Sequence, residues 1–136
     1  MIFVDTGAWI SQFSKRDQYH KEGATTFKGL QNRQVHLATS IPVIYETLTF
    51  LTREVGPETA IEAGRQIFGW KSLCLIRPDA DDENKALKIM EKFSDHPIGF
   101  VDCLSFVLIR RHRIDTAFTF DRHFAIVGFA TLPGEN

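Results

Sequence analysis

The sequence lacks the features that place a protein in a membrane or outside the cell. It has no apolar run that approaches the roughly 18–20 residues of a membrane-spanning helix, and no basic segment precedes an apolar one as in a leader peptide. Only two cysteines occur, Cys74 and Cys103, each inside an apolar segment and without a C-x-x-C spacing. Such thiols are typical of small core residues rather than of a disulfide or a zinc site. We therefore expect a cytoplasmic protein without a leader.

An excess of charge of one sign is also lacking. Sixteen Lys and Arg residues against seventeen Asp and Glu residues leave a formal net charge of −1, so a nucleic-acid partner would have to meet a local basic patch. The glycines form no G-x-G-x-x-G motif and no P-loop, which argues against a nucleotide cofactor. The five histidines show no H-x-x-x-H spacing, which argues against a zinc enzyme and favours ordinary surface or half-buried histidines.

Short apolar segments alternate with helical patterns along the chain. We expect one domain over residues 1–136, built as a three-layer α/β/α sandwich around a central, mostly parallel sheet. The acidic run at residues 79–83 suits a helix N-terminus and a solvent-exposed face. The expected strands cover residues 2–4, 35–38, 73–76 and 116–119, with a last one inside 126–132, and the expected helices cover 6–13, 20–30, 42–55, 57–70, 79–93 and 100–112.

Two aspartates directly follow apolar strand candidates. Asp5 ends the opening run Met1-Ile2-Phe3-Val4, and Asp121 ends Phe118-Thr119-Phe120. In open α/β sheets, ligands bind beyond the carboxyl ends of the strands, and a carboxylate there can hold a hard cation. Capping of a helix or turn explains each aspartate at least as well when it is taken alone.

Two further acids lie inside predicted helices. Asp102 occurs in a segment that is apolar nearly all round, where a carboxylate is costly unless it is paired or bound to a metal. Its place in the first helical turn also allows the milder explanation of the helix dipole. Glu46 points almost opposite the apolar stripe of its helix, which favours solvent exposure, although Val43 and Phe50 flank it.

The chemistry that uses four convergent carboxylates is metal-assisted phosphodiester hydrolysis. Such carboxylates repel one another at low dielectric unless divalent cations neutralise them. One or two Mg²⁺ or Mn²⁺ ions held in this way lower the pKa of a bound water and stabilise the attacking and leaving oxygens.

The order and separation of these motifs resemble a family of enzymes over essentially the whole chain. The chain is similar to a PIN-domain ribonuclease, and specifically to the toxin half of a VapBC-type toxin–antitoxin pair. The segments that carry the resemblance are Ile2-Phe3-Val4-Asp5-Thr6, Ile44-Tyr45-Glu46-Thr47-Leu48, Phe100-Val101-Asp102-Cys103-Leu104-Ser105 and Phe118-Thr119-Phe120-Asp121-Arg122-His123-Phe124.

The resemblance implies a metal-dependent endoribonuclease that leaves a 5′-phosphate and a 3′-hydroxyl. It carries over Asp5 and Asp102 as ligands of Mg²⁺ or Mn²⁺, with Glu46 and Asp121 completing the acidic pocket. It also implies an RNA substrate, a VapB-like antitoxin and a homodimer. Small hydroxyl residues that support the pocket in the family correspond here to Thr6, Ser105 and Thr119.

Several alternatives remain at the level of sequence. Arg122 and the cluster at residues 110–113 could contact RNA phosphates, although a solvated helix end explains the cluster better. A PIN nuclease of RNA processing would share the motifs, whereas loss of acidic residues would mark a non-catalytic PIN module, and here all four acids are present. A haloacid-dehalogenase-like phosphohydrolase needs a second Asp where Gly7 stands. A response-regulator receiver usually carries an acidic pair at the end of its first strand, where Asp5 is alone.

Overall fold

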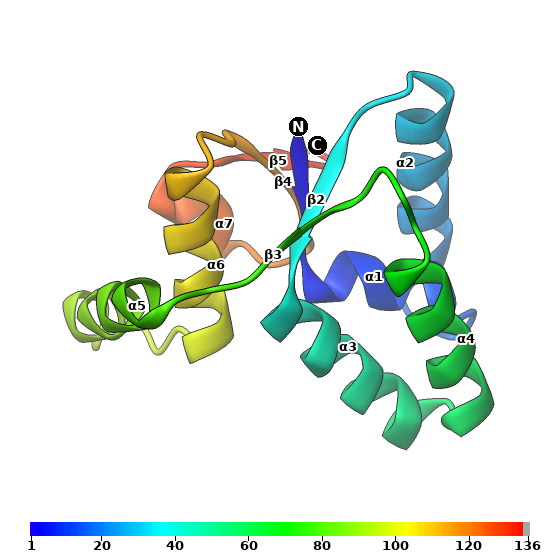
Figure 1. The fold of residues 1–136 in the computed structure, drawn as a ribbon, viewed down its shortest axis with the longest axis horizontal. Coiled ribbons are helices and arrows are strands. Elements are labelled where there is room, and N and C mark those ends of the chain that lie inside the picture. The colour runs from blue at the N-terminus through cyan, green and yellow to red at the C-terminus, as the bar shows by residue number, and fades with distance from the viewer. Residues whose placement is uncertain (135–136) are drawn as a thin grey trace.

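Five short strands form one parallel sheet at the centre of the structure, a computed structural model that describes residues 1–134 (Figure 1). The sheet has the order β3-β2-β1-β4-β5, and every neighbouring pair is parallel. Since the central strand β1 is covered on both faces, its sequence is a continuous apolar run. The strands are β1 (Ile2–Val4), β2 (Leu37–Ser40), β3 (Cys74–Ile76), β4 (Thr116–Phe118) and β5 (Ala130–Leu132).

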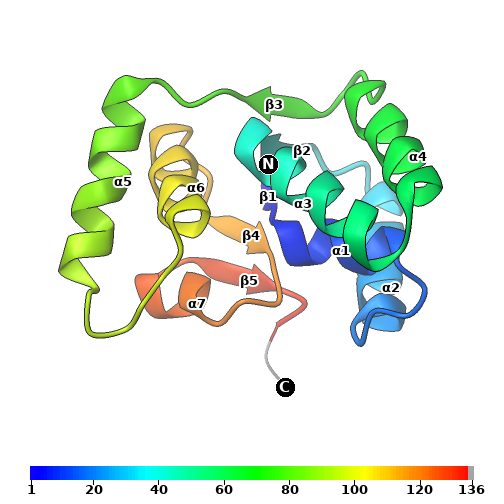
Figure 2. The ribbon, with the colours of Figure 1, turned by 90° about the horizontal axis from the view of Figure 1, so that it is seen from below.

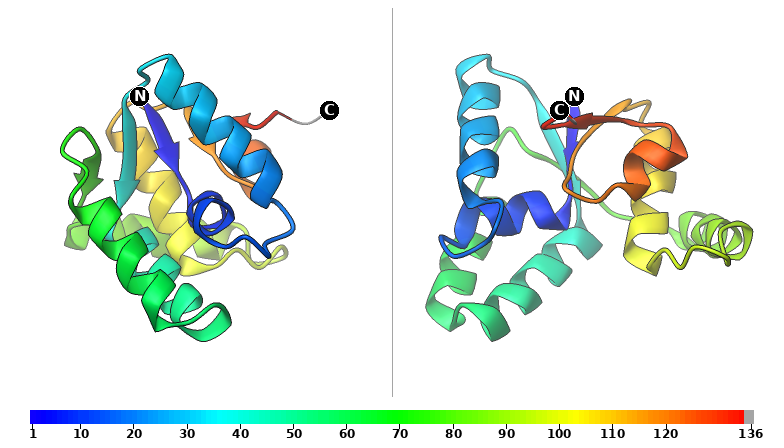
Figure 3. Two further views of the ribbon diagram at one scale, coloured as in Figure 1. Left: turned by 90° about the vertical axis from the view of Figure 1, so that its right-hand side faces the viewer. Right: turned by 180° about the vertical axis from the view of Figure 1, so that it is seen from behind.

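Helices cover both faces of this sheet (Figure 1 and Figure 3). The first face carries α1 (Thr6–Phe13), α2 (His20–Asn32), α3 (Ile41–Glu54) and α4 (Pro57–Phe68). The second face carries α5 (Ala80–Lys92), α6 (Phe100–Arg111) and the short α7 (His123–Val127). The predicted three-layer α/β/α arrangement with a parallel sheet is therefore confirmed. None of the helices within residues 1–134 has the length and apolarity needed to cross a membrane.

The order of the strands reverses between β1 and β4. From β1 the chain builds β2 and β3 on one side, and then returns to add β4 and β5 on the other side. Ligands of open α/β sheets bind at such a switch point, beyond the carboxyl ends of the strands. Figure 2 looks onto this end of the molecule, where α1, α3 and α6 surround the ends of the strands.

Packing beneath this end fixes the first helix against the sheet. Trp9 of α1 is 1% exposed, and its indole N–H donates to the Thr39 hydroxyl at 3.1 Å. Thr39 Oγ1 in turn donates to the Val4 carbonyl oxygen at 2.8 Å. This buried chain of hydrogen bonds ties α1, β2 and β1 together, so the residue between β1 and α1 has little freedom to move.

The ends of several predicted elements differ from the structure by one or two residues, and one short helix was not predicted. The second strand begins two residues later than expected, at Leu37. The segment in which only a strand was expected also contains part of α7, and the strand itself is confined to Ala130–Leu132. A five-residue helix is too short to show a 3.6-residue apolar period.

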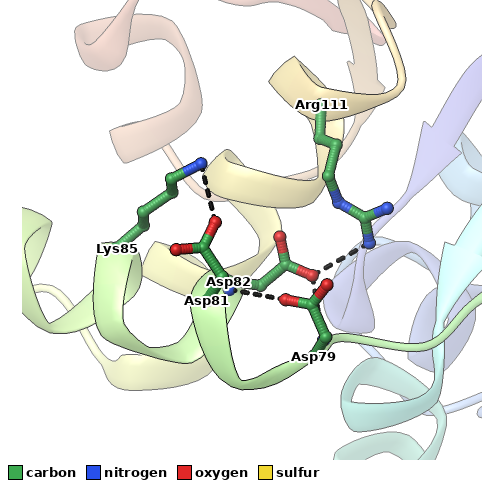
Figure 4. Close-up of polar contacts among 5 residues, drawn as sticks. All are labelled: Asp79, Asp81, Asp82, Lys85 and Arg111. Carbon is green, nitrogen blue, oxygen red and sulfur yellow. Dashed lines mark hydrogen bonds and ion pairs between the residues drawn. The ribbon is translucent and has the colours of Figure 1, made fainter.

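One acidic residue of the predicted solvent-exposed run is buried instead. The run begins a helix as expected, and Asp79 caps α5, accepting the Asp82 N–H at 2.8 Å, while Asp82 accepts the Asp79 N–H at 2.9 Å. Asp82 is only 1% exposed because Arg111 of α6 donates to the same carboxylate oxygen at 2.9 Å (Figure 4). The expectation of a fully solvated acidic face was therefore wrong for Asp82, whose charge is neutralised by a neighbouring helix.

Candidate active site

Two residues that follow neighbouring strands are hydrogen-bonded to each other across the switch point. Asp5 comes directly after β1, and its N–H donates to the Phe118 carbonyl oxygen of β4 at 3.0 Å. Thr119 comes directly after β4, and its hydroxyl donates to Asp5 Oδ2 at 2.9 Å. Asp5 and Thr119 are each 4% exposed. The end of the sheet thus carries a buried carboxylate at its centre.

The same threonine hydroxyl fixes the turn that carries Asp121. Thr119 Oγ1 accepts the Asp121 N–H at 3.0 Å, so a single hydroxyl links Asp5 and Asp121. Asp121 Oδ1 accepts the His123 N–H at 2.9 Å and lies 2.8 Å from His123 Nδ1. Asp121 therefore does cap the turn into α7. Asp5, by contrast, makes no side-chain capping bond to α1, so capping does not explain its carboxylate.

Asp102 enters from the other face of the sheet, in the first turn of α6. It is half-buried and lines the same cleft as Asp5. Burial and the nearby carboxylates of Asp5 and Asp121 raise the pKa of Asp102 from 3.8 to about 8. The first turn of α6 therefore holds a carboxylate whose surroundings disfavour its ionised form.

Asp5 is also unfavourable in its ionised form. Burial raises the pKa of its carboxyl group from 3.8 to about 7, and the nearby carboxylates of Asp121 and Glu46 add to the rise. The hydrogen bond from the Thr119 hydroxyl and the nearby Thr6 backbone lower this pKa, but they do not outweigh the burial. Positive charge brought close to such a pair of acids would restore their ionised forms.

The fourth acid, Glu46, is exposed and still belongs to the site. Helix α3 begins at the end of β2, where the Ser40 hydroxyl accepts the Val43 N–H at 3.3 Å, and its residues between Pro42 and Arg53 contribute to the lining of the cleft. Glu46 is exposed, as its position opposite the apolar stripe predicts. An open cleft of about 1080 Å³ is lined by all four acids, Asp5, Glu46, Asp102 and Asp121.

Three buried oxygen atoms near these acids have no hydrogen-bond partner among residues 1–134: Asp5 Oδ1, Thr6 Oγ1 and Ser105 Oγ. Thr6 follows Asp5 directly and lines the cleft, and Ser105 lies one helical turn after Asp102. A buried polar atom without a partner costs about 1–3 kcal/mol. Oxygen atoms left in this state beside the buried Asp5 and the half-buried Asp102 fit a site that accepts a cation.

The donor set itself favours a hard cation. All the candidate ligands are carboxylate or hydroxyl oxygens, which suit Mg²⁺ or Mn²⁺ rather than zinc. The acids line a common cleft without surrounding one point. Within residues 1–134, no group of three or more His, Cys, Asp and Glu side chains is arranged to hold a metal ion. The residues present thus fit a divalent cation in chemistry and electrostatics, in a cleft that is open.

The basic residues divide into those that line the cleft and those engaged elsewhere. Arg122 and Arg53 line it. Arg110 contacts the Val127 carbonyl oxygen and the Phe129 ring, and Arg111 pairs with Asp82. The basic cluster at the end of α6 therefore serves helix packing, whereas Arg122 is placed where the sequence predicted a contact with substrate.

Sequence reasoning missed several residues of the cleft. His123 lies beside Asp121, although no spacing of the histidines indicated a site. Tyr19, Tyr45 and Phe120 also line the cleft. Only Tyr45, Phe120 and His123 had a signal available, because they fall inside the motif segments next to Glu46 and Asp121. Tyr19 lies in a loop whose sequence shows no motif.

The sequence matches a known protein family and individual curated relatives. The PIN domain profile matches residues 2–130. Two curated relatives come from Mycobacterium tuberculosis. The first is the 23S rRNA-specific endonuclease VapC20, which is 29% identical over 99% of this chain and 100% of its own length. The second is ribonuclease VapC26, which is 27% identical over 91% of this chain and 90% of its own length.

Solved structures show the same fold. The crystal structure of M. tuberculosis VapC20, described as a sarcin–ricin loop cleaving toxin, matches with a TM-score of 0.86. The match has 29% identity and covers 96% of this chain and 97% of that one. A toxin–antitoxin complex from Klebsiella pneumoniae matches with a TM-score of 0.70 at 15% identity, covering all of both chains.

Proposed function

Since this chain belongs to the PIN-domain family, we propose that it is a divalent-metal-dependent endoribonuclease and the toxin of a type II toxin–antitoxin pair. The observation that carries the proposal is the buried carboxylate of Asp5, which lines one cleft with Asp102 and Asp121 at the switch point of the sheet and forms no ion pair with a cation of residues 1–134. A structural carboxylate in such a place would be expected to have a basic partner.

Each residue of the site has a distinct proposed role. Asp5 and Asp102 would hold Mg²⁺ or Mn²⁺, with Glu46 and Asp121 completing the acidic pocket. When bound, the ion would lower the pKa of the attacking water and stabilise negative charge on the phosphate. Thr119 keeps Asp5 and Asp121 in fixed positions through its hydroxyl.

The remaining polar groups act on the substrate and on the edge of the pocket. Arg122 is exposed on the wall of the cleft, where it can contact phosphate oxygens. The hydroxyls of Thr6 and Ser105 have no partner within residues 1–134 and would complete the polar surroundings of the ion. Cleavage would leave a 5′-phosphate and a 3′-hydroxyl on the RNA.

The relatives suggest the partners. VapC20 is named for cleavage of 23S rRNA, so a hairpin with the sarcin–ricin sequence is the first substrate to test here. We further propose that a VapB-like antitoxin inhibits the protein, that it forms a homodimer, and that it acts in the cytoplasm.

The test uses antitoxin-free protein with Mg²⁺, Mn²⁺ or EDTA, and the sarcin–ricin hairpin and transfer RNA as substrates. We expect cleavage only with metal, and its loss in Asp5→Asn and Asp102→Asn. The matched control is Asp81→Asn on α5, a carboxylate with 71% of its side chain exposed that pairs only with Lys85, and it should cleave like the wild type.

Two results would contradict the proposal. Metal binding without RNA cleavage would indicate a non-catalytic PIN module. Release of inorganic phosphate from a small phosphate ester, with RNA left intact, would indicate a phosphohydrolase instead.

A further inference from the structure

A partly exposed aromatic pair lies at the edge of the acidic cleft. The rings of Tyr19 and Phe120 are stacked, with centroids 4.3 Å apart and planes inclined by 5°. Tyr19 is 36% exposed, and both residues line the cleft. One face of the Tyr19 ring lies on Phe120, and the residue keeps part of its surface open to solvent. The cleft therefore has a flat apolar surface beside its carboxylates.

The chain connects this pair directly to the acidic residues. Phe120 stands between Thr119, which donates to Asp5, and Asp121, which accepts from His123. The Phe120 ring also packs edge-on against Phe118 of β4, with centroids 6.1 Å apart. The position of the stacked pair relative to the carboxylates is thus set by β4 and by the turn that follows it.

The Tyr19 backbone is held from both sides of the loop before α2. Its N–H donates to Asp17 Oδ2 at 3.0 Å, and its carbonyl oxygen accepts the Gly23 N–H at 2.8 Å. Helix α2 packs so closely on α1 that a Cβ atom at position 23, which is Gly23, would overlap the Ser11 side chain. A ring held in this way loses little conformational freedom when another ring stacks on it.

The charges around the pair distinguish a base from a phosphate. Asp17 lines the cleft near Tyr19, and Glu22 lines a second hollow of about 240 Å³ that shares Tyr19, Phe120 and Arg122 with the first. These carboxylates would repel a phosphate placed on the ring, whereas they would not repel an uncharged base. Arg122 lines both hollows, where it can contact the neighbouring phosphate.

We propose that the Tyr19–Phe120 pair is a stacking platform for an unpaired base of the RNA, adjacent to the phosphate that is cleaved. The inference rests on the proposed nuclease function and narrows its substrate. Bases offer their faces to an aromatic side chain only where they are unstacked, in single strands, loops and bulges. The substrate segment is therefore unpaired RNA rather than a regular duplex.

The first test compares cleavage kinetics on a hairpin RNA with an unpaired loop, in Mn²⁺. Stacking of one base on an aromatic side chain corresponds to a loss of about 10- to 100-fold on alanine substitution. We expect such a loss in kcat/KM for Tyr19→Ala, chiefly through KM, and near wild-type values for Tyr19→Phe. Phe120→Leu, which keeps apolar volume but removes the ring, should also lower kcat/KM. Phe68→Ala changes a partly exposed aromatic residue on α4 and serves as the matched control.

The second test changes the RNA. An abasic nucleotide is placed at each position next to the cleaved bond in turn. At one of these positions the abasic nucleotide should lower kcat/KM of the wild type by the same factor as Tyr19→Ala lowers it on intact RNA. When Tyr19→Ala is assayed on that abasic RNA, its kcat/KM should fall no further. Additive losses at every position would overturn the platform, because each change would then act independently.

A third readout does not depend on cleavage. In the Asp5→Asn background, single-stranded RNA carrying 2-aminopurine at the identified position should show quenched fluorescence on binding, and adding Tyr19→Ala should remove the quenching. If wild-type protein cleaves RNA and Tyr19→Ala matches it in KM and kcat, the platform is wrong while the nuclease assignment stands. If wild-type protein cleaves no RNA with Mg²⁺ or Mn²⁺, the nuclease assignment fails and the platform fails with it.

Discussion

Two aspartates of this chain are almost completely buried, and they are neutralised in different ways. Asp82 is 1% exposed, and its carboxylate forms an ion pair with Arg111, whose guanidinium donates a hydrogen bond to it at 2.9 Å (Figure 4). Asp5 is 4% exposed, and the only hydrogen bond to its carboxylate from residues 1–134 comes from the Thr119 hydroxyl. Each leaves one carboxylate oxygen without a partner among residues 1–134. At Asp82 the chain supplies the cation itself, and at Asp5 the cation has to come from outside.

This difference separates a structural carboxylate from a functional one. Breaking the Asp82 pair should lower stability and leave the chemistry intact, because Arg111 and the α5 cap lie outside the cleft. Neutralising Asp5 should remove the chemistry and relieve an electrostatic cost in the metal-free protein. The four predictions that follow test this contrast.

The largest effect is expected for Asp5→Asn. RNA cleavage should fall by about 1000-fold or more, because several kcal/mol of transition-state stabilisation depend on the bound ion. In EDTA the same variant should unfold at a higher temperature than the wild type. This gain in unfolding temperature should be larger at about pH 8 than at about pH 5. Burial raises the pKa of Asp5 to about 7 in the folded protein, and a raised pKa makes stability fall as the pH rises through it.

Cleavage assays and thermal unfolding in EDTA check both parts. A variant that is less stable than the wild type in EDTA would show that the Asp5 carboxylate is a structural group, contrary to the contrast drawn with Asp82.

A smaller loss of activity is expected for Thr119→Val. The change removes the hydroxyl that joins Asp5 to Asp121, and loss of a group that orients a metal ligand costs about 10- to 100-fold in activity or metal affinity. Thr119→Ser keeps the hydroxyl and should retain most of the activity. Cleavage rates measured over a range of Mn²⁺ concentrations separate weaker metal binding from slower chemistry, and equal rates for the two variants would rule out the orienting role.

Asp82→Ala should affect stability alone. It removes half of the α5 capping box and the partner of Arg111, which we expect to lower the free energy of unfolding by about 2 kcal/mol. Asp81→Ala, which breaks an exposed pair with Lys85, should change it by less than about 1 kcal/mol. Denaturant unfolding measures both, and cleavage below the unfolding transition should match the wild type. Loss of cleavage by folded Asp82→Ala would contradict the division between the two sites.

The smallest effect concerns the acid limb of the stability curve. A hydrogen bond from the Asp82 backbone holds the pKa of Asp79 below its ordinary value of 3.8. The ionised cap therefore stabilises the fold above that value, and the contribution is lost as the pH falls through the lower, folded-state pKa. Asp79→Asn keeps a capping acceptor that does not titrate, so its unfolding temperature should fall less steeply than that of the wild type in acid. Parallel curves would show that the cap does not titrate with folding.

Much of the fold follows from local patterns in the sequence. Helix α1 begins and ends where the pattern places it, at Thr6 and Phe13, because the apolar strand before it and the polar loop after it are both distinct. The start of β2 was less certain, since Val35 and Leu37 flank a polar residue and either can begin a strand. Helix α7 is too short for its period to show.

The site was predictable only in part, for a physical reason. Periodicity describes how a side chain faces its own helix, and it correctly places Glu46 away from the core. It cannot show that α3 runs along the end of the sheet, so that the same exposed side chain lines a cleft. Tyr19 is brought to the cleft by packing of α2 on α1, and Asp82 is buried by a residue of another helix. Tertiary contacts of this kind leave no periodic signal.

The most direct test of whether Asp5 binds an external cation is calorimetric titration of Mn²⁺ into antitoxin-free wild-type protein, Asp5→Asn and Asp82→Ala. We expect the wild type and Asp82→Ala to bind Mn²⁺ with similar affinity, and Asp5→Asn to have lost the binding. Equal Mn²⁺ binding by Asp5→Asn and the wild type would contradict this expectation, because the buried carboxylate of Asp5 would then have no external cation to accept.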